Sequence, residues 1–145
     1  RPDEALAADS KIVCLDESLV RGTQLKENVG RLGECGVKEV HIRIACPPLL
    51  YPCVFLNCSP SRSTVDLFAR RVVRDLEGTS DLTDDILKDY ANPDSDKYKA
   101  MVKAMGQHLQ LDSLAFQRLD DLVASIGLPK ERLCTHCWDN SSYLE

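Results

Sequence analysis

Two adjacent acids, Asp16 and Glu17, follow a short apolar run and precede a small polar loop. The apolar run, residues 12–15, predicts a buried strand, and open α/β sheets bind their ligands at the carboxyl ends of such strands. Two acids repel a phosphate, but each carboxylate accepts hydrogen bonds from hydroxyl groups. The pair therefore suits the hydroxyl groups of a bound ribose.

The loop after the acids has the size and composition of a phosphate-binding turn, and a segment with helical periodicity follows it. Backbone N–H groups in such a loop and in the first turn of the next helix lack intrahelical partners, and the helix dipole favours an anion there. Strand, acid pair, loop and helix in this order predict a sugar-phosphate site; a solvated strand-to-helix turn is the alternative. The residues expected to hold the phosphate are Ser18, Val20, Arg21, Gly22 and Thr23.

A second group of residues suited to chemistry lies near the C-terminus, where Cys134 and Cys137 form a Cys-x-x-Cys pair. The spacing is that of metal ligands, but one such pair is only half of a zinc site. His136, between the two cysteines, is a further zinc ligand by type. A redox pair is expected near the start of a helix that follows a strand, which is not the setting here. Two interpretations stay open: a metal site completed by distant residues, or reduced thiols packed in the fold.

The elements that must position these groups follow from hydrophobic periodicity. Residues 23–35 predict a helix, because Leu25, Val29 and Leu32 share one face. Residues 37–45 alternate apolar and polar side chains and predict a second strand. Strand, helix and strand make one βαβ unit with parallel strands.

The second half of the chain is mainly helical by the same criterion. A capping-box pattern at residues 63–66 predicts a helix that ends near Gly78. Further helices are expected at residues 82–90, 96–109 and 119–126, with a short strand at residues 114–116. We therefore predict an α/β fold: residues 1–58 hold part of a parallel-sheet, Rossmann-like core with the loop, and residues 59–145 form a mainly helical region with the Cys-x-x-Cys end.

Composition limits the class of protein. The 145 residues suit one domain, and a net charge of −5 without a basic stripe argues against nucleic-acid binding. No apolar run in the sequence has the length of a membrane span, so no membrane partner is expected. Seven cysteines, an odd number, fit reduced thiols in the cytoplasm better than a disulfide framework.

The stretch KIVCLDESLVRGTQ, residues 11–24, resembles the phosphoribosyl pyrophosphate (PRPP) signature of type I phosphoribosyltransferases. Its Val-Arg-Gly-Thr form resembles the amidophosphoribosyltransferase family, the glutamine PRPP amidotransferases. Residues 36–53, 112–129 and 134–138 are similar to successive segments of the C-terminal part of that family. The family usually has two aspartates where this chain has Asp16 and Glu17, so one of the two side chains is a methylene longer here.

The resemblance implies a glycosyltransferase of purine biosynthesis that transfers glutamine-derived ammonia to C1 of PRPP with the help of Mg²⁺. Asp16 and Glu17 then bind the ribose hydroxyls, and residues 18–23 bind the 5′-phosphate. It also implies a homo-oligomeric, cytoplasmic parent protein with purine nucleotides as feedback inhibitors. We expect the chain to be a C-terminal fragment of that parent, with the glutaminase domain upstream in the same chain. No catalytic residue is expected in the fragment, which alone is expected to be inactive.

The resemblance also gives Cys53 a role beside Cys134 and Cys137, because some members ligate a [4Fe–4S] cluster at these positions. Their fourth ligand lies upstream of this chain, and four thiolates are the usual requirement. The expectation for this chain is a poorly held cluster, zinc, or no metal. Two other functions stay open: a regulator that senses PRPP, and an interaction module held by a metal. A regulator of this type usually carries a surface that binds nucleic acid, and the negative net charge of the chain argues against such a surface.

Overall fold

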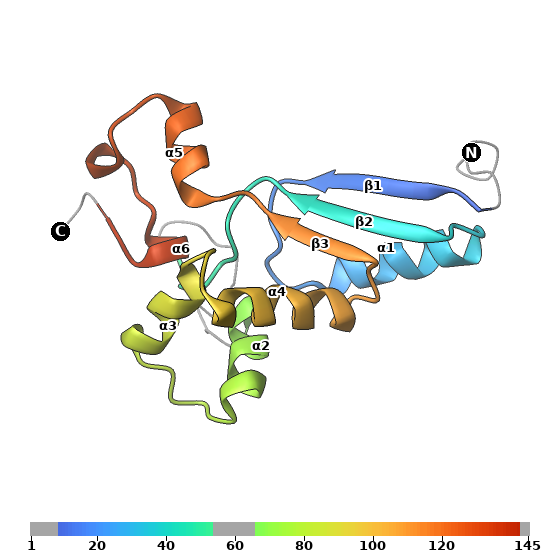
Figure 1. Ribbon diagram of the computed structural model, residues 1–145, viewed down its shortest axis with the longest axis horizontal. Coiled ribbons are helices and arrows are strands. Elements are labelled where there is room, and N and C mark those ends of the chain that lie inside the picture. The colour runs from blue at the N-terminus through green and yellow to red at the C-terminus, as the bar shows by residue number, and fades with distance from the viewer. Residues whose placement is uncertain (1–8, 54–65, 143–145) are drawn as a thin grey trace.

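The computed structural model describes residues 9–53 and 66–142, and a three-stranded parallel sheet forms one side of the described fold (Figure 1). The strands are β1 (Lys11–Asp16), β2 (Glu39–Ile44) and β3 (Ser113–Phe116), in the order β1-β2-β3. The sheet and its helices confirm the predicted α/β class. Because the strands are parallel, their carboxyl ends meet at one edge of the sheet.

The predicted βαβ unit is present as β1, α1 (Thr23–Glu34) and β2. Lys11 pairs with Glu39 at the start of β1, and Asp16 pairs with Ile44 at its end, so the whole strand lies beside β2. The helix predicted at residues 23–35 and the strand predicted at residues 37–45 are confirmed, with ends that differ by one or two residues. Asp16 is thus the last residue of β1, one residue beyond the predicted end of the strand, and Glu17 and the loop lie between β1 and α1.

The third strand comes from far along the chain and is held by α4 (Asp96–His108), which packs on β3. The same helix packs on α2 (Phe68–Glu77) and on α3 (Asp84–Ala91). The hydroxyls of Ser95 and Thr83 cap α4 and α3 by accepting from a backbone N–H three residues later. The predicted helices and the short third strand are thus confirmed, except for the predicted start of α2. This helix begins at Phe68, after an extended Leu67 and without a side-chain cap, and residues 63–65 of the predicted capping box lie outside the described residues.

The hydrophobic core joins the sheet to these helices. Ile42 and Ile44 of β2, Val73 of α2, and Met101 and Met105 of α4 belong to it, and each is at most 2% exposed. The core thus draws on both sides of the expected division at residue 58, and that division stays a prediction. Among the described helices, none is long and apolar enough to cross a lipid bilayer.

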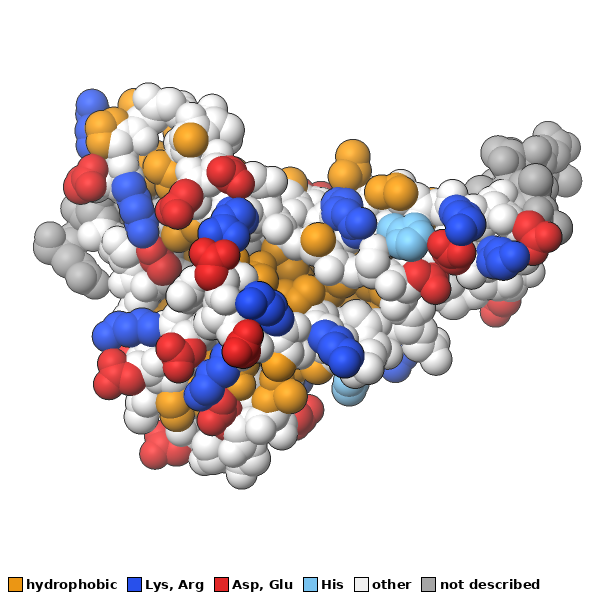
Figure 2. All heavy atoms as spheres, in the orientation of Figure 1, with side chains coloured by type: hydrophobic (Ala, Val, Ile, Leu, Met, Phe, Trp, Pro, Cys, Tyr) orange, Lys and Arg blue, Asp and Glu red, His pale blue; other side chains and the backbone are white. Residues whose placement is uncertain are grey.

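One face of β1 is half-buried and the other is exposed, so the prediction of a buried strand is wrong. Val13 is 62% exposed and Leu15 is 83% exposed, whereas Cys14, on the opposite face, packs against the core. Figure 1 shows α1 and α4 on one side of the sheet and no described helix over the strands on the other side. Figure 2 shows hydrophobic side chains at the surface over the sheet, beside basic ones and a histidine.

The C-terminal segment returns to the middle of the chain through α5 (Leu119–Ile126), the 3-10 turn η3 (Lys130–Arg132) and α6 (His136–Asp139). The backbone carbonyl of Cys137 accepts from the N–H groups of Leu50 and Tyr51, at 2.9 and 3.0 Å. These bonds fix α6 to the segment that follows β2.

Asp139 stabilises this returning segment. Its carboxylate accepts hydrogen bonds from Lys130 Nζ at 2.7 Å, from Thr135 Oγ1 at 2.7 Å and from the N–H of Ser141 at 3.1 Å. Burial acts to raise the pKa of Asp139, but these bonds outweigh it and hold the pKa below the ordinary value of 3.8. The ionised form therefore stabilises the fold above pH 3.8, and this contribution is lost as the pH falls through the lowered pKa.

Replacing Asp139 with asparagine is expected to lower the free energy of unfolding at pH 7 by about 1–3 kcal/mol, because a charged acceptor is lost. Urea unfolding followed by the fluorescence of Trp138, the single tryptophan, measures the change. The difference from wild type should disappear as the pH falls below the pKa of Asp139. Asp85→Asn, at an exposed carboxylate that pairs with Lys88, is the control; equal midpoints for Asp139→Asn and wild type at pH 7 would contradict this role.

Candidate functional site

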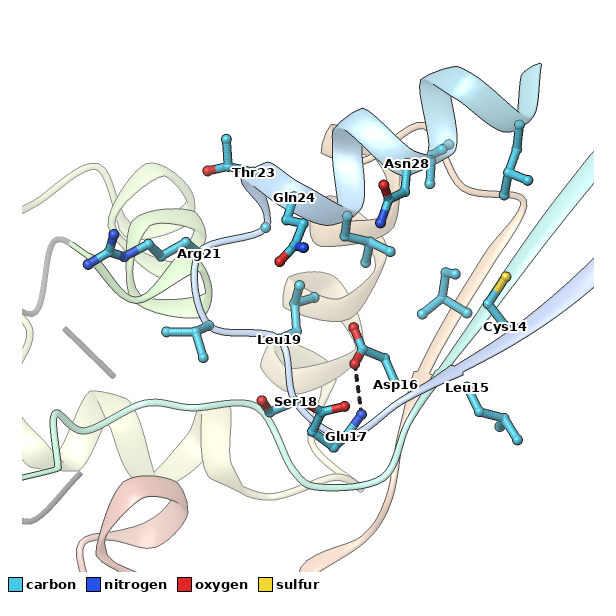
Figure 3. A pocket seen from close by; sticks show the side chains of 16 residues that line it. Cys14, Leu15, Asp16, Glu17, Ser18, Leu19, Arg21, Thr23, Gln24 and Asn28 are labelled. Atoms are coloured by element: carbon cyan, nitrogen blue, oxygen red, sulfur yellow. Dashed lines mark hydrogen bonds between the residues drawn. The ribbon is translucent and has the colours of Figure 1, made fainter. Parts of the chain in front are cut away.

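An open cleft of about 1010 Å³ lies at the carboxyl end of β1, between that strand, the following loop and α1 (Figure 3). This is the place where a parallel sheet is expected to bind a ligand. The seven residues predicted to bind PRPP all line it: Asp16, Glu17, Ser18, Val20, Arg21, Gly22 and Thr23. The structure thus brings the acid pair and the loop into one site, and their contacts with a ligand stay a prediction.

The two acids have different surroundings. The carbonyl of Asp16 accepts from the N–H of Ala45 at 2.9 Å, which fixes the strand end, and Asp16 Oδ1 accepts from the N–H of Glu17 at 2.9 Å. Partial burial raises the pKa of Asp16, and the neighbouring acid adds to the rise. A bond from its own backbone N–H lowers the pKa of the exposed Glu17. The cleft therefore holds two carboxyl groups of unequal acidity.

Helix α2 holds the loop from outside, although it lies far along the chain. The N–H of Phe68 donates to the carbonyl of Val20 at 2.7 Å, and Arg71 Nη2 donates to the carbonyl of Arg21 at 2.7 Å. The Arg71 guanidinium also lies over the Phe68 ring, 5.5 Å from its centroid. Leu19, only 4% exposed, anchors the same loop in the core. Two consecutive loop carbonyls are thus bonded to one helix.

These bonds fix the direction of the loop N–H groups, because the carbonyl and the N–H of a planar trans peptide point in opposite directions. With the carbonyls of Val20 and Arg21 directed at α2, the N–H groups of Arg21 and Gly22 are directed away from that helix, and both residues line the cleft. Gly22 (φ 77°) is also the N-cap of α1, where no side chain caps the helix and no acid lies in the first turn. The helix start therefore offers further donors to an anion.

The Arg21 side chain extends toward α2 rather than into the cleft (Figure 3). Its Nη2 lies 3.7 Å from Asp66 Oδ2, at an ion pair on the outer side of the loop. In this arrangement the guanidinium of Arg21 pairs with Asp66, and the part of Arg21 available to a ligand in the cleft is its backbone.

Sequence reasoning missed two amide side chains that line the cleft. Gln24 and Asn28 project from the first turns of α1 on the side that faces Asp16 (Figure 3). Their spacing of four residues, which places them on one helix face, is the signal in the sequence. That signal is weak, because both residue types are common on solvated helix faces. Each amide offers a donor and an acceptor for sugar or phosphate oxygens.

Replacing Arg71 with methionine is expected to weaken binding of ribose 5-phosphate about fivefold, since the carbonyl of Arg21 loses its donor and the loop amides lose their fixed direction. Methionine keeps most of the apolar stem against Phe68, so the fold should persist. Calorimetric titration of both proteins measures the change. Arg74→Met, on the same helix, is the matched control. Equal losses of affinity from both substitutions would show an effect of charge and would contradict the role of the Arg71 hydrogen bond.

The cysteines predicted as ligands do not form a metal site in the described part of the chain. Backbone bonds bring the segment before Cys53 beside Cys137, and the ring of Tyr51 lies 5.8 Å from that of His136. Within residues 9–53 and 66–142, however, no group of three or more His, Cys, Asp or Glu side chains could hold a metal ion. The residues as placed do not fit a [4Fe–4S] cluster or zinc. Metal binding by Cys53, Cys134 and Cys137 stays a prediction.

The fold and the cleft together define a phosphoribosyltransferase-type α/β region. It has parallel strands, acids at the end of β1, and a loop that presents backbone N–H groups at the start of α1. No family model matches the chain.

Over nearly its whole length the chain is homologous to amidophosphoribosyltransferases. It is 28% identical over 144 residues to the enzyme of Mycobacterium tuberculosis (strain ATCC 25618 / H37Rv), a match that covers 99% of this chain and 23% of that protein. It is 31% identical over 121 residues to the enzyme of Drosophila melanogaster, covering 83% of this chain and 17% of that one. The chain therefore spans about a quarter or less of the length of these relatives.

A solved structure shows the same fold. It is the glutamine PRPP amidotransferase of Bacillus subtilis in complex with ADP and GMP, and it superimposes with a TM-score of 0.62 at 23% identity. The match covers 94% of this chain and 24% of that one. At this level of identity the likeness concerns the fold alone.

Proposed function

We propose that the chain is the PRPP-binding part of an amidophosphoribosyltransferase, and that its cleft binds the ribose 5-phosphate portion of PRPP. The observation that carries the proposal is the bonding of the Val20 and Arg21 carbonyls to α2, which directs the N–H groups of the same peptides away from that helix in a loop that lines the cleft. Homology to amidophosphoribosyltransferases supports the class of substrate.

In this proposal the two halves of the cleft have different tasks. Asp16 and Glu17 accept hydrogen bonds from the ribose hydroxyls, while the loop N–H groups and the α1 dipole hold the 5′-phosphate. Departure of pyrophosphate from C1 builds positive charge on the sugar ring. Carboxylates beside the ring fix its orientation and stabilise that charge. Gln24 and Asn28 are placed to bond the remaining sugar or phosphate oxygens.

The reaction of the whole protein would convert PRPP, glutamine and water to phosphoribosylamine, glutamate and pyrophosphate. Mg²⁺ bound with the pyrophosphate group would neutralise part of the leaving-group charge, and the oxygens of Asp16 and Glu17 are of the type that this cation prefers. The chain spans 23% of its Mycobacterium tuberculosis relative, and we propose that turnover needs the rest of such a protein. The chain alone would bind the sugar phosphate without catalysis.

Purine nucleotides are the second class of ligand that we propose for this cleft. A purine nucleoside 5′-phosphate carries the same ribose 5-phosphate group as PRPP, so it would meet the same acids and the same loop. The Bacillus subtilis protein was solved with ADP and GMP. Competition between a purine nucleotide and PRPP would make the cleft a point of feedback inhibition.

Calorimetric titration of the chain tests the proposal, with ribose 5-phosphate, ribose and inorganic phosphate as three separate ligands. We expect ribose 5-phosphate to bind more tightly than either of its parts, because acids and loop act together. Equal affinities for phosphate and ribose 5-phosphate would remove the ribose role of the acids. Absence of binding by all three would refute the sugar-phosphate site, and turnover of PRPP by the chain alone would refute its inactivity.

A further inference from the structure

One peptide group, between Ile44 and Ala45, joins the carboxyl ends of all three strands. The carbonyl of Ile44, at the end of β2, accepts from the N–H of Gln117, which follows β3, at 2.9 Å. The N–H of Ala45 donates to the carbonyl of Asp16, at the end of β1, at 2.9 Å. The position of this peptide therefore fixes the strand end that carries the acid pair into the cleft. Whatever holds the chain just after Ala45 also holds the acids.

The residue after Ala45 is Cys46, whose buried thiol lies close to the acid pair and to α6. Cys46 is 9% exposed, and its Sγ donates to the carbonyl of Pro47 at 3.3 Å. Burial raises the pKa of this thiol to about 11, although the nearby indole N–H of Trp138 acts to lower it, and the charges of Asp16 and Glu17 add to the rise. The thiol is therefore protonated at neutral pH and packs as a small apolar group.

Trp138 contacts the segment after β2 over several residues. Its indole Nε1 is buried and has no oxygen or nitrogen acceptor among the described residues, and the thiol of Cys46 lies near it. Trp138 also lines a small cavity together with Pro47 and Pro48, and its ring packs against the hydrophobic core. Helix α6, which carries Trp138, is bonded through its backbone to the same segment a few residues further on. The segment between β2 and α6 is thus held at both of its ends.

We propose that Trp138 is a positioning residue for the acid pair of the cleft, because it holds the segment whose Ala45 N–H fixes the end of β1. The inference rests on the proposed function, since it concerns the ribose half of the same site. The phosphate half has a different support, because α2 holds the carbonyls of the loop. The ribose and the 5′-phosphate are therefore positioned through two separate parts of the chain, α6 and α2.

Calorimetric titration with ribose 5-phosphate and with inorganic phosphate, as separate ligands, tests the inference. Trp138→Leu is expected to weaken binding of ribose 5-phosphate about tenfold, because the space left by the indole lets the segment after β2 shift. Trp138→Phe keeps an aromatic ring, so the fold should persist and the loss should be smaller. Both variants should bind inorganic phosphate as the wild type does, whereas Arg71→Met should weaken binding of both ligands.

Amide hydrogen exchange followed by NMR tests the same inference without a ligand. In Trp138→Phe the N–H of Ala45 is expected to exchange at least threefold faster than in the wild type, because its bond to Asp16 opens more often. The N–H of Phe68, which bonds the loop, should keep its rate. Ile126→Ala, at an exposed apolar residue of α5, is the control and should change neither rate and neither affinity.

The outcomes separate this inference from the proposed function. A wild-type chain that binds ribose 5-phosphate no more tightly than inorganic phosphate would refute the ribose site itself. If the wild type does prefer ribose 5-phosphate, two results would overturn the role of Trp138. One is that the Trp138 variants keep the full preference, or lose affinity for both ligands equally; the other is that exchange of the Ala45 N–H stays unchanged.

Discussion

Replacing Gly22 with valine is expected to reduce binding of ribose 5-phosphate at least tenfold and to lower the free energy of unfolding by about 1–3 kcal/mol. Gly22 has φ 77°, a conformation that a β-branched residue rarely adopts. A Cβ atom at this position would also lie 3.1 Å from Cδ1 of Phe68. Either the loop or Phe68 must move. Both movements would disturb the orientation of the loop N–H groups, because the N–H of Phe68 donates to the carbonyl of Val20 in the loop. Calorimetry and urea unfolding measure the two effects.

Gly30→Ala is the matched control within the same βαβ unit. Gly30 lies inside α1, and a Cβ there meets nothing within 4 Å. Alanine in a helix interior is expected to raise the free energy of unfolding by about 0.5–1 kcal/mol and to leave ligand binding unchanged. If Gly22→Val and Gly30→Ala had the same affinity for ribose 5-phosphate, the loop conformation would have no special role in binding.

Asp16→Asn is expected to weaken binding of ribose 5-phosphate about 10- to 100-fold, because the bond between a ribose hydroxyl and a charged acceptor is worth about 1.5–3 kcal/mol. The asparagine oxygen can still accept from the N–H of Glu17, so the strand end should persist. Partial burial raises the pKa of Asp16 in the fold. Its ionisation therefore opposes folding as the pH rises through that pKa, and the neutral substitution is expected not to destabilise the chain.

The raised pKa of Asp16 sets the pH dependence of ribose 5-phosphate binding. Only ionised Asp16 is a full acceptor, so the affinity of the wild type should fall as the pH decreases through the raised pKa of Asp16. The Asp16→Asn protein should lack this step, while Asp85→Asn, at a residue that does not line the cleft, should keep it. Unchanged affinity in Asp16→Asn at neutral pH would remove the ribose role of this carboxylate.

The segments that form the site could be predicted because they are consecutive in the sequence. An apolar run, two acids, a short loop and a helical pattern follow one another without interruption, and each is a local signal. The structure places all of these residues around one cleft. The helices could be predicted for the same reason, since apolar residues recur at helical spacing within each of them, as Tyr98, Met101 and Met105 do in α4.

The support of the loop could not be predicted, because it depends on contacts between distant parts of the chain. Arg71 bonds the carbonyl of Arg21 across 50 residues of sequence, and no local pattern joins the two. The open face of β1 was also hidden. Val13 and Leu15 give the same apolar pattern whether another element covers them or solvent does.

A ¹H–¹⁵N NMR titration with ribose 5-phosphate tests most directly whether the loop amides hold the phosphate. We expect the amide signals of Arg21, Gly22 and Thr23 to move furthest, inorganic phosphate to move the same signals less, and ribose to leave them in place. Binding that leaves these three amides unmoved, or that shifts mainly residues outside the cleft, would contradict the proposed site.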